Sequence, residues 1–406
     1  MNIKIQKSKI VNPNSVIQIT GSKSESNRLL ILQALYPELQ IENLSNSDDT
    51  KLMRSALYNL SDVNDVNHAG TAMRFLTAYF SILKNREVII TGSPRMKERP
   101  IKILVEALHD LGAQIDYLEK KGFPPLKIKG GELNNNKVIL KANVSSQYIS
   151  ALLLIAPKLK NGLELSLEGE IVSMPYIKMT LELLRKIGVK TSFENNIISV
   201  EYKSKIENHK LVIESDWSSA SYFYSCIALS DLNTELVLSS FKNKSLQGDA
   251  VLAEIYKEFG VETTFLKNSI LLKKRKRTLS ALNLDLVNSP DIAQTIVITC
   301  LGLGVACNLT GLHTLKIKET DRLLALKAEI EKLGGKVKIT NHSLQLFASE
   351  TINPNIKIST YNDHRMAMAF APLALKTSIE IKDAKVISKS YPTYWNDLKA
   401  IGFKIT

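Results

Sequence analysis

Apolar runs typical of buried helices, each opened by small or polar residues, recur six times along the chain. They begin at Ser22, Gly70, Ser145, Ser218, Asp291 and Asp363. Successive starts are 48, 75, 73, 73 and 72 residues apart. The spacing predicts an array of one repeat of about 73 residues, of which the first copy is shortened.

A second helix is predicted inside each repeat, 26 to 29 residues after the first helix begins. These second helices start near Asp48, Arg99, Met174, Gln247, Glu319 and Pro392. Most of them end at a glycine that follows an apolar residue, the sequence signature of a left-handed helix C-cap. The glycines are Gly112, Gly188, Gly260, Gly334 and Gly402.

Short apolar or alternating runs between the helices predict strands. They cover residues 88–91, 163–167, 211–214 and 235–238, and residues 1–20 also alternate as a strand. The predicted repeat is β-α-β-α-β-β, an α/β fold, and six repeats divide into two domains of three with a boundary at residues 214–218. Only residues 61–67 separate the second helix of the first repeat from the next repeat, so a hairpin is missing there.

Composition is that of an ordinary globular protein, with 44% hydrophobic residues, and the net charge of +13 favours anionic partners. Cys226, Cys300 and Cys307 lie in or beside apolar helical runs without paired spacing, which predicts reduced core thiols and a cytoplasmic location. The sequence has no metal-ligand cluster, and we expect no cofactor. The most apolar stretch, residues 292–309, contains polar residues and glycines, so we predict a buried helix and no membrane span.

The polar run before the first helix has the charges of an anion site. Lys23, Ser24 and Arg28 lie where a helix begins with free N–H groups, which already favour negative charge. The required glycine-rich run of a nucleotide P-loop is absent, and a solvated lysine is the alternative. The 95–100 loop, RMKERP, is either a solvated basic turn or a site where Arg99 offers its guanidinium to a carboxylate or phosphate.

Repeats three and four offer uncharged or ambiguous candidates. Ser145, Ser146 and Gln147 suit sugar hydroxyls or phosphate oxygens, but they also suit a helix N-cap, as does Ser173. In repeat four Asp216, Ser218 and Ser219 are interpreted as caps. The run KKRKR at 273–277 is interpreted as a solvated strand edge, with a nucleic-acid-binding patch as the alternative.

Repeat five has the strongest candidate chemistry. Asp291 starts its first helix, and the run KETDR at 318–322 starts its second. Since equivalent helix starts should lie at one end of a domain, these residues can converge although they are distant in sequence. Two carboxylates among cations suit proton transfer beside an anionic substrate, whereas caps and surface ion pairs are the alternative. The charged residues of repeats five and six are Asp291, Lys318, Glu319, Arg322, Arg365 and Lys389.

With these motifs in view, the sequence resembles the 5-enolpyruvylshikimate-3-phosphate synthase family from end to end. The motifs that carry the resemblance are GSKSESNR, AGTAMR, PRMKERP, SSQ, SMPY, PDIAQT, KETDR and YNDHRMAM. The resemblance implies a two-domain inside-out α/β barrel with three repeats per domain, formed by residues 1–20 and 215–406 and by residues 21–214. Hinges near 20–21 and 214–215 would let the domains close on the substrate.

The resemblance also implies a reaction, the transfer of the enolpyruvyl group of phosphoenolpyruvate to the 5-hydroxyl of shikimate 3-phosphate. The catalytic residues would be Asp291, Glu319, Lys318 and Lys23. Shikimate 3-phosphate would be bound by Lys23, Ser24, Arg28, Ser145, Ser146, Gln147, Ser173, Asp291 and Lys318. Phosphoenolpyruvate would be bound by Lys23, Gly70, Arg99, Gln147, Arg322, Arg365 and Lys389. We expect a monomer without nucleic-acid or membrane partners, inhibited by glyphosate.

Three positions depart from the family's pattern: His68 replaces a usual Asn, Met174 a common Lys, and Thr314 an Asn that contacts the sugar phosphate. Two alternative functions remain for the chain. One is a sister enolpyruvyl transferase acting on UDP-N-acetylglucosamine, which is disfavoured because the 95–100 loop has no cysteine. The other is a basic nucleic-acid-binding protein, which gives no reason for Asp291 and Glu319.

Overall fold

The computed structural model describes residues 1–11, 15–59, 61–141, 145–207, 209–277 and 280–406. The chain folds into two compact units. Unit 1 consists of Met1–Gly21 and Glu214–Thr406, and unit 2 consists of Ser22–Ile213. The chain therefore leaves unit 1 after about twenty residues, builds the whole of unit 2, and then returns.

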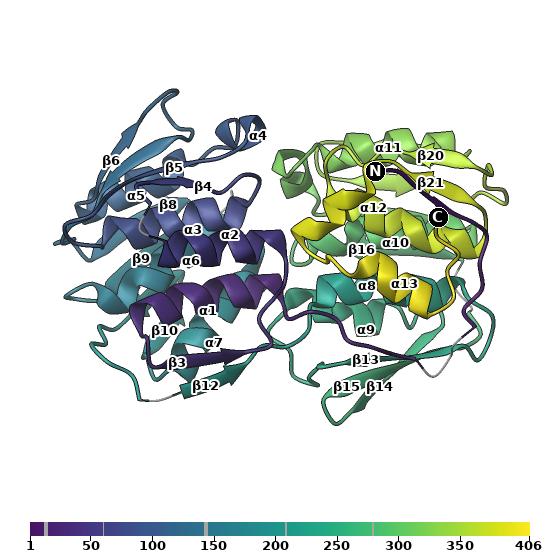
Figure 1. Ribbon diagram of the computed structural model, residues 1–406, viewed down its shortest axis with the longest axis horizontal. Helices are drawn as coiled ribbons and strands as arrows, with labels where there is room; N and C mark the ends of the chain where they lie inside the picture. The colour runs from purple at the N-terminus through teal and green to yellow at the C-terminus, as the bar shows by residue number, and fades with distance from the viewer. Residues whose placement is uncertain (12–14, 60, 142–144, 208, 278–279) are drawn as a thin grey trace. The chain divides into compact units, whose positions relative to one another are not determined.

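Unit 2 is built from short helices and short strands (Figure 1). Its helices are α1 (Lys23–Leu35), α2 (Asp48–Tyr58), α3 (Gly70–Ser81), α4 (Pro94–Lys97), α5 (Lys102–Leu111), α6 (Ser146–Ile155), the 3₁₀ turn η1 (Ala156–Lys158) and α7 (Met174–Lys186). Its strands are β3 (Leu39–Glu42), β4 (Val63–Asp65), β5 (Glu87–Thr91), β6 (Gln114–Tyr117), β7 (Leu126–Lys129), β8 (Lys137–Lys141), β9 (Leu163–Glu168), β10 (Thr191–Glu194), β11 (Ile197–Val200) and β12 (His209–Val212).

Unit 1 has the same kinds of elements. Its helices are α8 (Trp217–Leu229), α9 (Leu252–Ile255), α10 (Ala293–Leu303), α11 (Arg322–Lys332), α12 (His364–Phe370) and α13 (Tyr394–Ala400). Its 3₁₀ turns are η2 (Gly248–Val251), η3 (Pro290–Ile292), η4 (His313–Ile317), η5 (Ala371–Leu375) and η6 (Ala384–Lys389). Its strands are β1 (Ile3–Ile5), β2 (Val16–Ile17), β13 (Glu235–Ser239), β14 (Val261–Leu266), β15 (Ser269–Lys274), β16 (Ala281–Asp285), β17 (Ala306–Thr310), β18 (Val337–Ile339), β19 (Leu344–Leu346), β20 (Ile356–Ile358) and β21 (Ile379–Ile381).

Four of the sheets share one topology, in which a parallel pair of strands is extended by two antiparallel strands. Their strand orders are β4-β5-β7-β6, β8-β9-β11-β10, β2-β13-β15-β14 and β16-β17-β19-β18. In the β4-β5-β7-β6 sheet, helix α3 connects the two parallel strands, and the antiparallel strands β6 and β7 form the next hairpin. The parallel pair of β2 and β13 differs, because the whole of unit 2 lies between these strands. The sequence repeat is therefore a repeat of β-sheet topology.

The first repeat is the short one, as its sequence spacing predicts. Helix α2 ends at Tyr58 and β4 begins at Val63, which leaves no room for a hairpin. Strand β3 of this repeat instead pairs in parallel with β12, the last strand of unit 2. The missing hairpin thus reduces one sheet to two strands and leaves the helices in place.

The helices that begin the repeats form the interior of each unit, and the sheets lie outside them (Figure 1). In unit 2 helices α1, α3 and α6 pack on one another, and in unit 1 helix α10 packs on α8 and α12. Nearly every residue of α3, α6, α8 and α10 is buried, as expected for helices that are apolar on all sides. All five predicted cap glycines have positive φ angles, from 73° to 113°.

Two predictions about strands are wrong. Residues 1–20 do not form one strand: β1 pairs with β21, whereas β2 pairs with β13 in another sheet. The KKRKR run is not a strand edge, because its first two residues end β15, which lies between β13 and β14. Arg275 and Lys276 follow this strand and are exposed. Since successive side chains of a strand point to opposite faces, Lys273 reaches the exterior and pairs with Glu235, while Lys274 is 6% exposed. The buried Lys274 ammonium donates to the Phe259 carbonyl at 2.8 Å.

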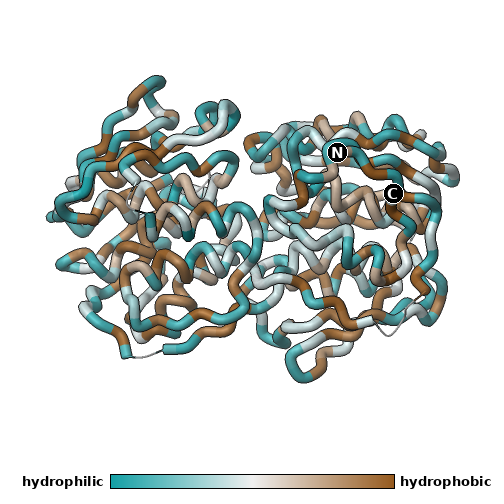
Figure 2. Tube along the Cα trace, viewed as in Figure 1, coloured by the Kyte–Doolittle hydropathy of each residue, from teal (hydrophilic) through white to brown (hydrophobic). Residues whose placement is uncertain are grey.

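The three cysteines are buried and unpaired, as predicted for core thiols. Figure 2 shows hydrophobic positions interspersed with hydrophilic ones in the helices and strands of both units. Among the described residues, each helix is too short or too polar to cross a membrane.

Candidate active site

Arg322 is the centre of a network of charges in unit 1. Its guanidinium donates to Asp363 at 2.7 Å, to Asp291 at 2.9 Å and to Glu319 at 2.9 Å. The side chain of Arg322 is 2% exposed and that of Asp363 is fully buried. One buried cation therefore holds three carboxylates that come from three different parts of the chain.

The helix starts explain this convergence. Arg322 is the first residue of α11, where Asp321 caps the helix by accepting from the amides of Leu323 and Leu324. Asp363 caps α12 by accepting from the Arg365 amide at 2.8 Å. Because α10 packs against both α11 and α12, the residues at the start of these helices lie together. The convergence predicted for repeats five and six is present.

Further cations surround the carboxylates of this network. The Arg365 guanidinium lies 3.1 Å from the Asp291 carboxylate and donates to the Asp291 carbonyl at 3.0 Å. The Lys318 ammonium is 3.5 Å from Asp291, and the Lys389 ammonium donates to Glu319 at 2.6 Å. Asp291 and Glu319 are each held by at least two cations.

The electrostatics of the network favour ionised groups. Burial by itself would raise the pKa of Asp291, but Arg365, Lys318 and Arg322 outweigh it and hold the pKa well below its usual range. Burial likewise disfavours the charged Arg322, yet Asp363, Glu319 and Asp291 raise its pKa above the ordinary value. Asp291 is therefore a carboxylate in this state of the protein.

Asp249 adjoins this network and was missed at the sequence level. It is 3% exposed and accepts from the Ser218 hydroxyl, which lies 3.4 Å from the Arg365 guanidinium. Burial and the neighbouring Asp291 raise the pKa of Asp249 to about 7, and its Oδ1 has no hydrogen-bond partner among the described residues. The prediction that Ser218 is a cap is wrong, because Asp216 caps α8; the Ser218 hydroxyl instead connects two charged side chains.

The sequence did contain a signal for Asp249. It lies at the start of the second helical segment of repeat four, and the equivalent positions of other repeats carry candidate residues. That segment is the 3₁₀ turn η2 followed by the four-residue helix α9, so its weak helical pattern made the position inconspicuous.

Arg28 is the most buried cation among the candidates in unit 2. Its guanidinium donates to the Thr180 hydroxyl at 2.8 Å, to the Ser150 hydroxyl at 3.0 Å and to the Ser24 carbonyl at 2.8 Å. It also lies over the rings of Phe75 and Tyr176. Within the described residues Arg28 forms no ion pair, and burial lowers its pKa to about 10.

Lys23 lies one turn before Arg28 on the same helix. Its ammonium is 3.3 Å from the carboxylate of Asp49, which is almost buried at the start of α2. Ser22 caps α1 by accepting from the Glu25 amide at 3.4 Å. Lys23, Ser24 and Arg28 therefore occupy the first two turns of α1, with Lys23 oriented by a neighbouring helix start.

Arg99 and Gly70 are in direct contact in unit 2. A side chain at position 70 would overlap the Arg99 guanidinium, so glycine is required here for the arginine to lie against the start of α3. Arg74 donates to the carbonyls of Gly70 at 3.2 Å and of Pro100 at 2.8 Å. Burial and the adjacent Arg99 lower the pKa of Arg74 to about 10. The predicted basic loop is thus fixed against the helix start by a second arginine.

Arg74 was also missed, although it is a single charge within an apolar helix and a charge in that position needs a reason. Arg99 itself is half-buried, and its guanidinium has no ion pair or hydrogen bond within the part of the chain that the structure describes. Two neighbouring guanidinium groups without a carboxylate partner are suited to binding an anion.

The uncharged candidates of repeat three lie at two helix starts. Ser145 caps α6 by accepting from the Gln147 amide at 3.3 Å, and the Gln147 side chain donates to the Thr71 hydroxyl at 3.2 Å. Ser146 and Ser173 are largely buried. Ser173 occupies the N-cap position of α7 with a φ of 55°, but its side chain forms no cap hydrogen bond.

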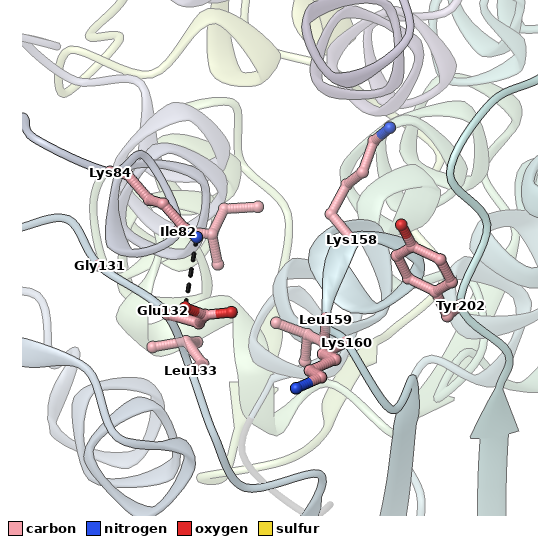
Figure 3. Close-up of a pocket in the computed structure, with 9 residues that line it drawn as sticks. All are labelled: Ile82, Lys84, Gly131, Glu132, Leu133, Lys158, Leu159, Lys160 and Tyr202. Atoms are coloured by element: carbon pink, nitrogen blue, oxygen red, sulfur yellow. Dashed lines mark hydrogen bonds and ion pairs between the residues drawn. The ribbon is translucent and has the colours of Figure 1, made fainter.

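A separate pocket of about 320 Å³ lies in unit 2, beyond the C-terminal ends of α3 and α6 (Figure 3). Lys84, Lys158 and Lys160 line it, and Figure 3 shows Lys84 paired with Glu132. Lysines are expected here because they neutralise the negative ends of the helices. The candidate residues lie at the opposite, N-terminal ends of the same helices, so this pocket is not the candidate site.

Comparison with known proteins identifies relatives of the whole chain. The family model of EPSP synthase (3-phosphoshikimate 1-carboxyvinyltransferase) matches residues 60–398. The 3-phosphoshikimate 1-carboxyvinyltransferase of Bacteroides fragilis strain YCH46 is 47% identical over 395 residues, which cover 96% of each protein. The enzyme of the same name from Haemophilus influenzae strain Rd is 36% identical over 440 aligned positions, which cover 99% of each protein.

Solved structures show the same fold. The EPSP synthase of Acinetobacter baumannii superposes with a TM-score of 0.81 at 20% identity, covering 100% of this chain and 99% of the other. The enolpyruvyl transferase NikO of Streptomyces tendae superposes with a TM-score of 0.75 at 13% identity, covering 100% and 98%. The mixed α/β fold is therefore that of the enolpyruvyl transferases.

Proposed function

Since the chain belongs to the EPSP synthase family, we propose how its own residues bind the two substrates and move the proton in the family's reaction. That reaction transfers the enolpyruvyl group of phosphoenolpyruvate to the 5-hydroxyl of shikimate 3-phosphate and releases phosphate. It is a step of the shikimate pathway to the aromatic amino acids.

The observation that carries the proposal is the buried Arg28, whose described hydrogen bonds all go to neutral groups. A guanidinium desolvated in this way is stabilised when a dianion binds beside it. The phosphate of shikimate 3-phosphate supplies that charge. The residues proposed to bind this substrate are Lys23, Ser24, Arg28, Ser145, Ser146, Gln147, Ser173, Asp291 and Lys318.

Phosphoenolpyruvate carries a phosphate and a carboxylate, and the chain offers cations for both. Arg99 lies against Gly70, and its half-buried guanidinium has no described partner. This supports a role for Arg99 in binding phosphoenolpyruvate. Arg365 and Lys389 supply charge at the other proposed positions. The residues proposed to bind phosphoenolpyruvate are Lys23, Gly70, Arg99, Gln147, Arg322, Arg365 and Lys389.

Asp291 is proposed to accept the proton of the 5-hydroxyl. With Arg365, Lys318 and Arg322 close by, its carboxylate is too weak a base to take a proton from a hydroxyl readily. Anionic substrates that draw these cations into new ion pairs would weaken their hold on Asp291 and raise its pKa. Substrate binding would thereby create the base, and proton transfer would wait until the substrates are present.

The proposed chemistry is an addition followed by an elimination. The 5-oxygen bonds to C2 of phosphoenolpyruvate while C3 gains a proton, and the hydroxyl proton goes to Asp291. The C2–O bond to phosphate then breaks and C3 loses a proton. Glu319 and Lys318 are proposed to handle the proton at C3, and Lys23, together with Arg322 and Lys389, would stabilise the departing phosphate.

The finer architecture is part of the same proposal. The sheets around two groups of interior helices support an inside-out barrel in each domain, with the domains at residues 1–20 plus 215–406 and at 21–214. We propose a monomer that acts in the cytoplasm, where the three buried thiols stay reduced. Glyphosate is proposed to compete with phosphoenolpyruvate, which inhibition kinetics at varied phosphoenolpyruvate concentration would test.

The test of the function is phosphate release from phosphoenolpyruvate with three acceptors: shikimate 3-phosphate, UDP-N-acetylglucosamine and none. Release with shikimate 3-phosphate alone is expected. Release with the nucleotide sugar alone would keep the donor residues and contradict every acceptor assignment. Release without an acceptor would indicate hydrolysis of phosphoenolpyruvate and contradict the transfer itself.

A further inference from the structure

The turn that leads into α12 has an unusual backbone. Tyr361 and Asn362 are consecutive residues with φ of 53° and 56°, and the turn is closed by the Asp363 amide donating to the Thr360 carbonyl at 2.8 Å. Two successive left-handed residues are normal for asparagine and glycine, whereas tyrosine seldom adopts this conformation. Such strain persists only where other contacts hold it.

One contact that holds this turn is the hydroxyl of Tyr361, which donates to Glu329 at 2.6 Å. Glu329 lies in α11 with a fully buried side chain, and it also accepts from the Lys332 ammonium at 2.7 Å and 2.9 Å. Tyr361 itself is 39% exposed. Since its ring is not enclosed, the hydrogen bond to a charged and immobile acceptor fixes the side chain.

Two side chains of helix α11 therefore contact the turn. Arg322 and Glu329 are seven residues apart, two turns of helix, and so lie on one face of α11. Arg322 holds Asp363, and Glu329 holds Tyr361 two residues earlier. Asp363 in turn fixes the amide of Arg365. The turn cannot relax while both contacts are in place.

We propose that Tyr361, through its hydrogen bond to Glu329, is a positioning residue that holds the Thr360–Asp363 turn so that Arg365 is ready to bind phosphoenolpyruvate. This inference rests on the proposed role of Arg365 in binding that substrate. A positioning role of Tyr361 differs from a merely structural one, because loss of the hydrogen bond should change substrate binding more than the stability of the protein.

The first variant is Tyr361→Phe, which removes one oxygen from a side chain that is partly exposed. The KM for phosphoenolpyruvate should rise about tenfold, the effect of losing one hydrogen bond to a charged group. The KM for shikimate 3-phosphate should change less than about twofold, and Tm should change little. The matched control is Tyr224→Phe, which loses a hydroxyl contact of 2.9 Å to Thr263 in the same unit and should leave both KM values unchanged.

A second variant, Glu329→Gln, keeps an oxygen that can accept from Tyr361. It should retain a KM for phosphoenolpyruvate closer to that of the wild-type protein than Tyr361→Phe does. In Tyr361→Phe, a fall in Tm with both KM values and the local amide exchange unchanged would overturn the inference and leave a structural contact.

Amide hydrogen exchange of the substrate-free protein separates this inference from the proposed function. Peptides that contain residues 360–366 should exchange faster in Tyr361→Phe, with the rest of unit 1 unchanged. Unchanged exchange in this segment would overturn the inference whatever the kinetics. Faster exchange with an unchanged KM would instead contradict the role of Arg365, and a wild-type protein without phosphate release would contradict the proposed function.

Discussion

Arg28 in unit 2 and Arg322 in unit 1 are both buried guanidinium groups in the first two turns of a helix, but their hydrogen-bond partners differ. Arg322 has three carboxylates within 2.9 Å, and its pKa is raised. Arg28 has hydroxyl and carbonyl partners, and its pKa falls from 12.5 to about 10. That difference corresponds to roughly 3 kcal/mol against the charged form of Arg28.

The difference shows how burial can serve two purposes. Around Arg322 the buried positive charge has carboxylate partners within the protein, and the surrounding cations keep Asp291 ionised. Arg28 forms no described ion pair, and the nearby Glu25 does not offset its desolvation, so free energy lost by desolvation can be recovered when an anion binds. We propose that the first arrangement organises catalysis and that the second binds the phosphate of the substrate.

The largest effect is expected for Asp291→Asn, which removes the proposed proton acceptor from the network around Arg322. Turnover should fall by about 10²- to 10⁴-fold, the usual contribution of a general base. Shikimate 3-phosphate should still bind, because Arg28 is untouched. Steady-state kinetics and calorimetric titration check this, and a variant that turns over at the wild-type rate would remove Asp291 from the mechanism.

Replacing Arg322 by methionine tests how much its ion pairs contribute to the stability of the protein. Arg322→Met leaves the buried Asp363 without its cation, so the free energy of unfolding should fall by about 3 to 5 kcal/mol. Urea denaturation measures it. The control is Arg275→Met, which breaks an exposed pair with Glu262 in the same unit and should cost less than about 1 kcal/mol. Equal losses in the two variants would mean that burial of the network has no energetic consequence.

The matching change in unit 2 is Arg28→Met. Arg28 has no described ion pair, so we expect a small loss of stability, below about 1 kcal/mol, because relief from desolvation offsets the lost hydrogen bonds. Affinity for shikimate 3-phosphate should fall about 100-fold, or roughly 3 kcal/mol. Arg185→Met, which removes a surface charge from the same unit, serves as the control. A large loss of stability with unchanged affinity for shikimate 3-phosphate would contradict the proposed difference between Arg28 and Arg322.

The smallest effect concerns pH and Asp249. The folded protein keeps a proton on this carboxyl up to about pH 7, whereas the unfolded chain loses it near 3.8. The stability that Asp249 contributes is therefore lost as pH rises from about 4 to about 7. The side chain of Asp249→Asn does not titrate. Between pH 5 and pH 8, the free energy of unfolding of this variant should therefore rise by about 2 to 3 kcal/mol relative to that of the wild-type protein. Unfolding curves at both pH values test this, and a constant difference would mean that Asp249 titrates normally.

Local patterns in the sequence were enough to predict the repeat, most helix starts and the glycine caps. These features depend on neighbouring residues: a glycine after an apolar residue adopts a positive φ at Gly112 as it does at Gly402, whatever packs around it. The candidate residues at helix starts were accessible for the same reason, because a repeat places equivalent positions together. Asp291, Lys318 and Arg322 could thus be predicted to meet.

The partners of these residues were decided by tertiary structure alone. Arg322 meets Asp363 across 41 residues, and Arg365 meets Asp291 across 74, so helix packing rather than local sequence selects them. Packing also buried Lys274 and left Arg28 without a described ion pair, although both are simply basic residues in the sequence. Composition determines how many charges a chain carries, but the free energy of each charge depends on desolvation and on neighbours that only the folded chain brings near.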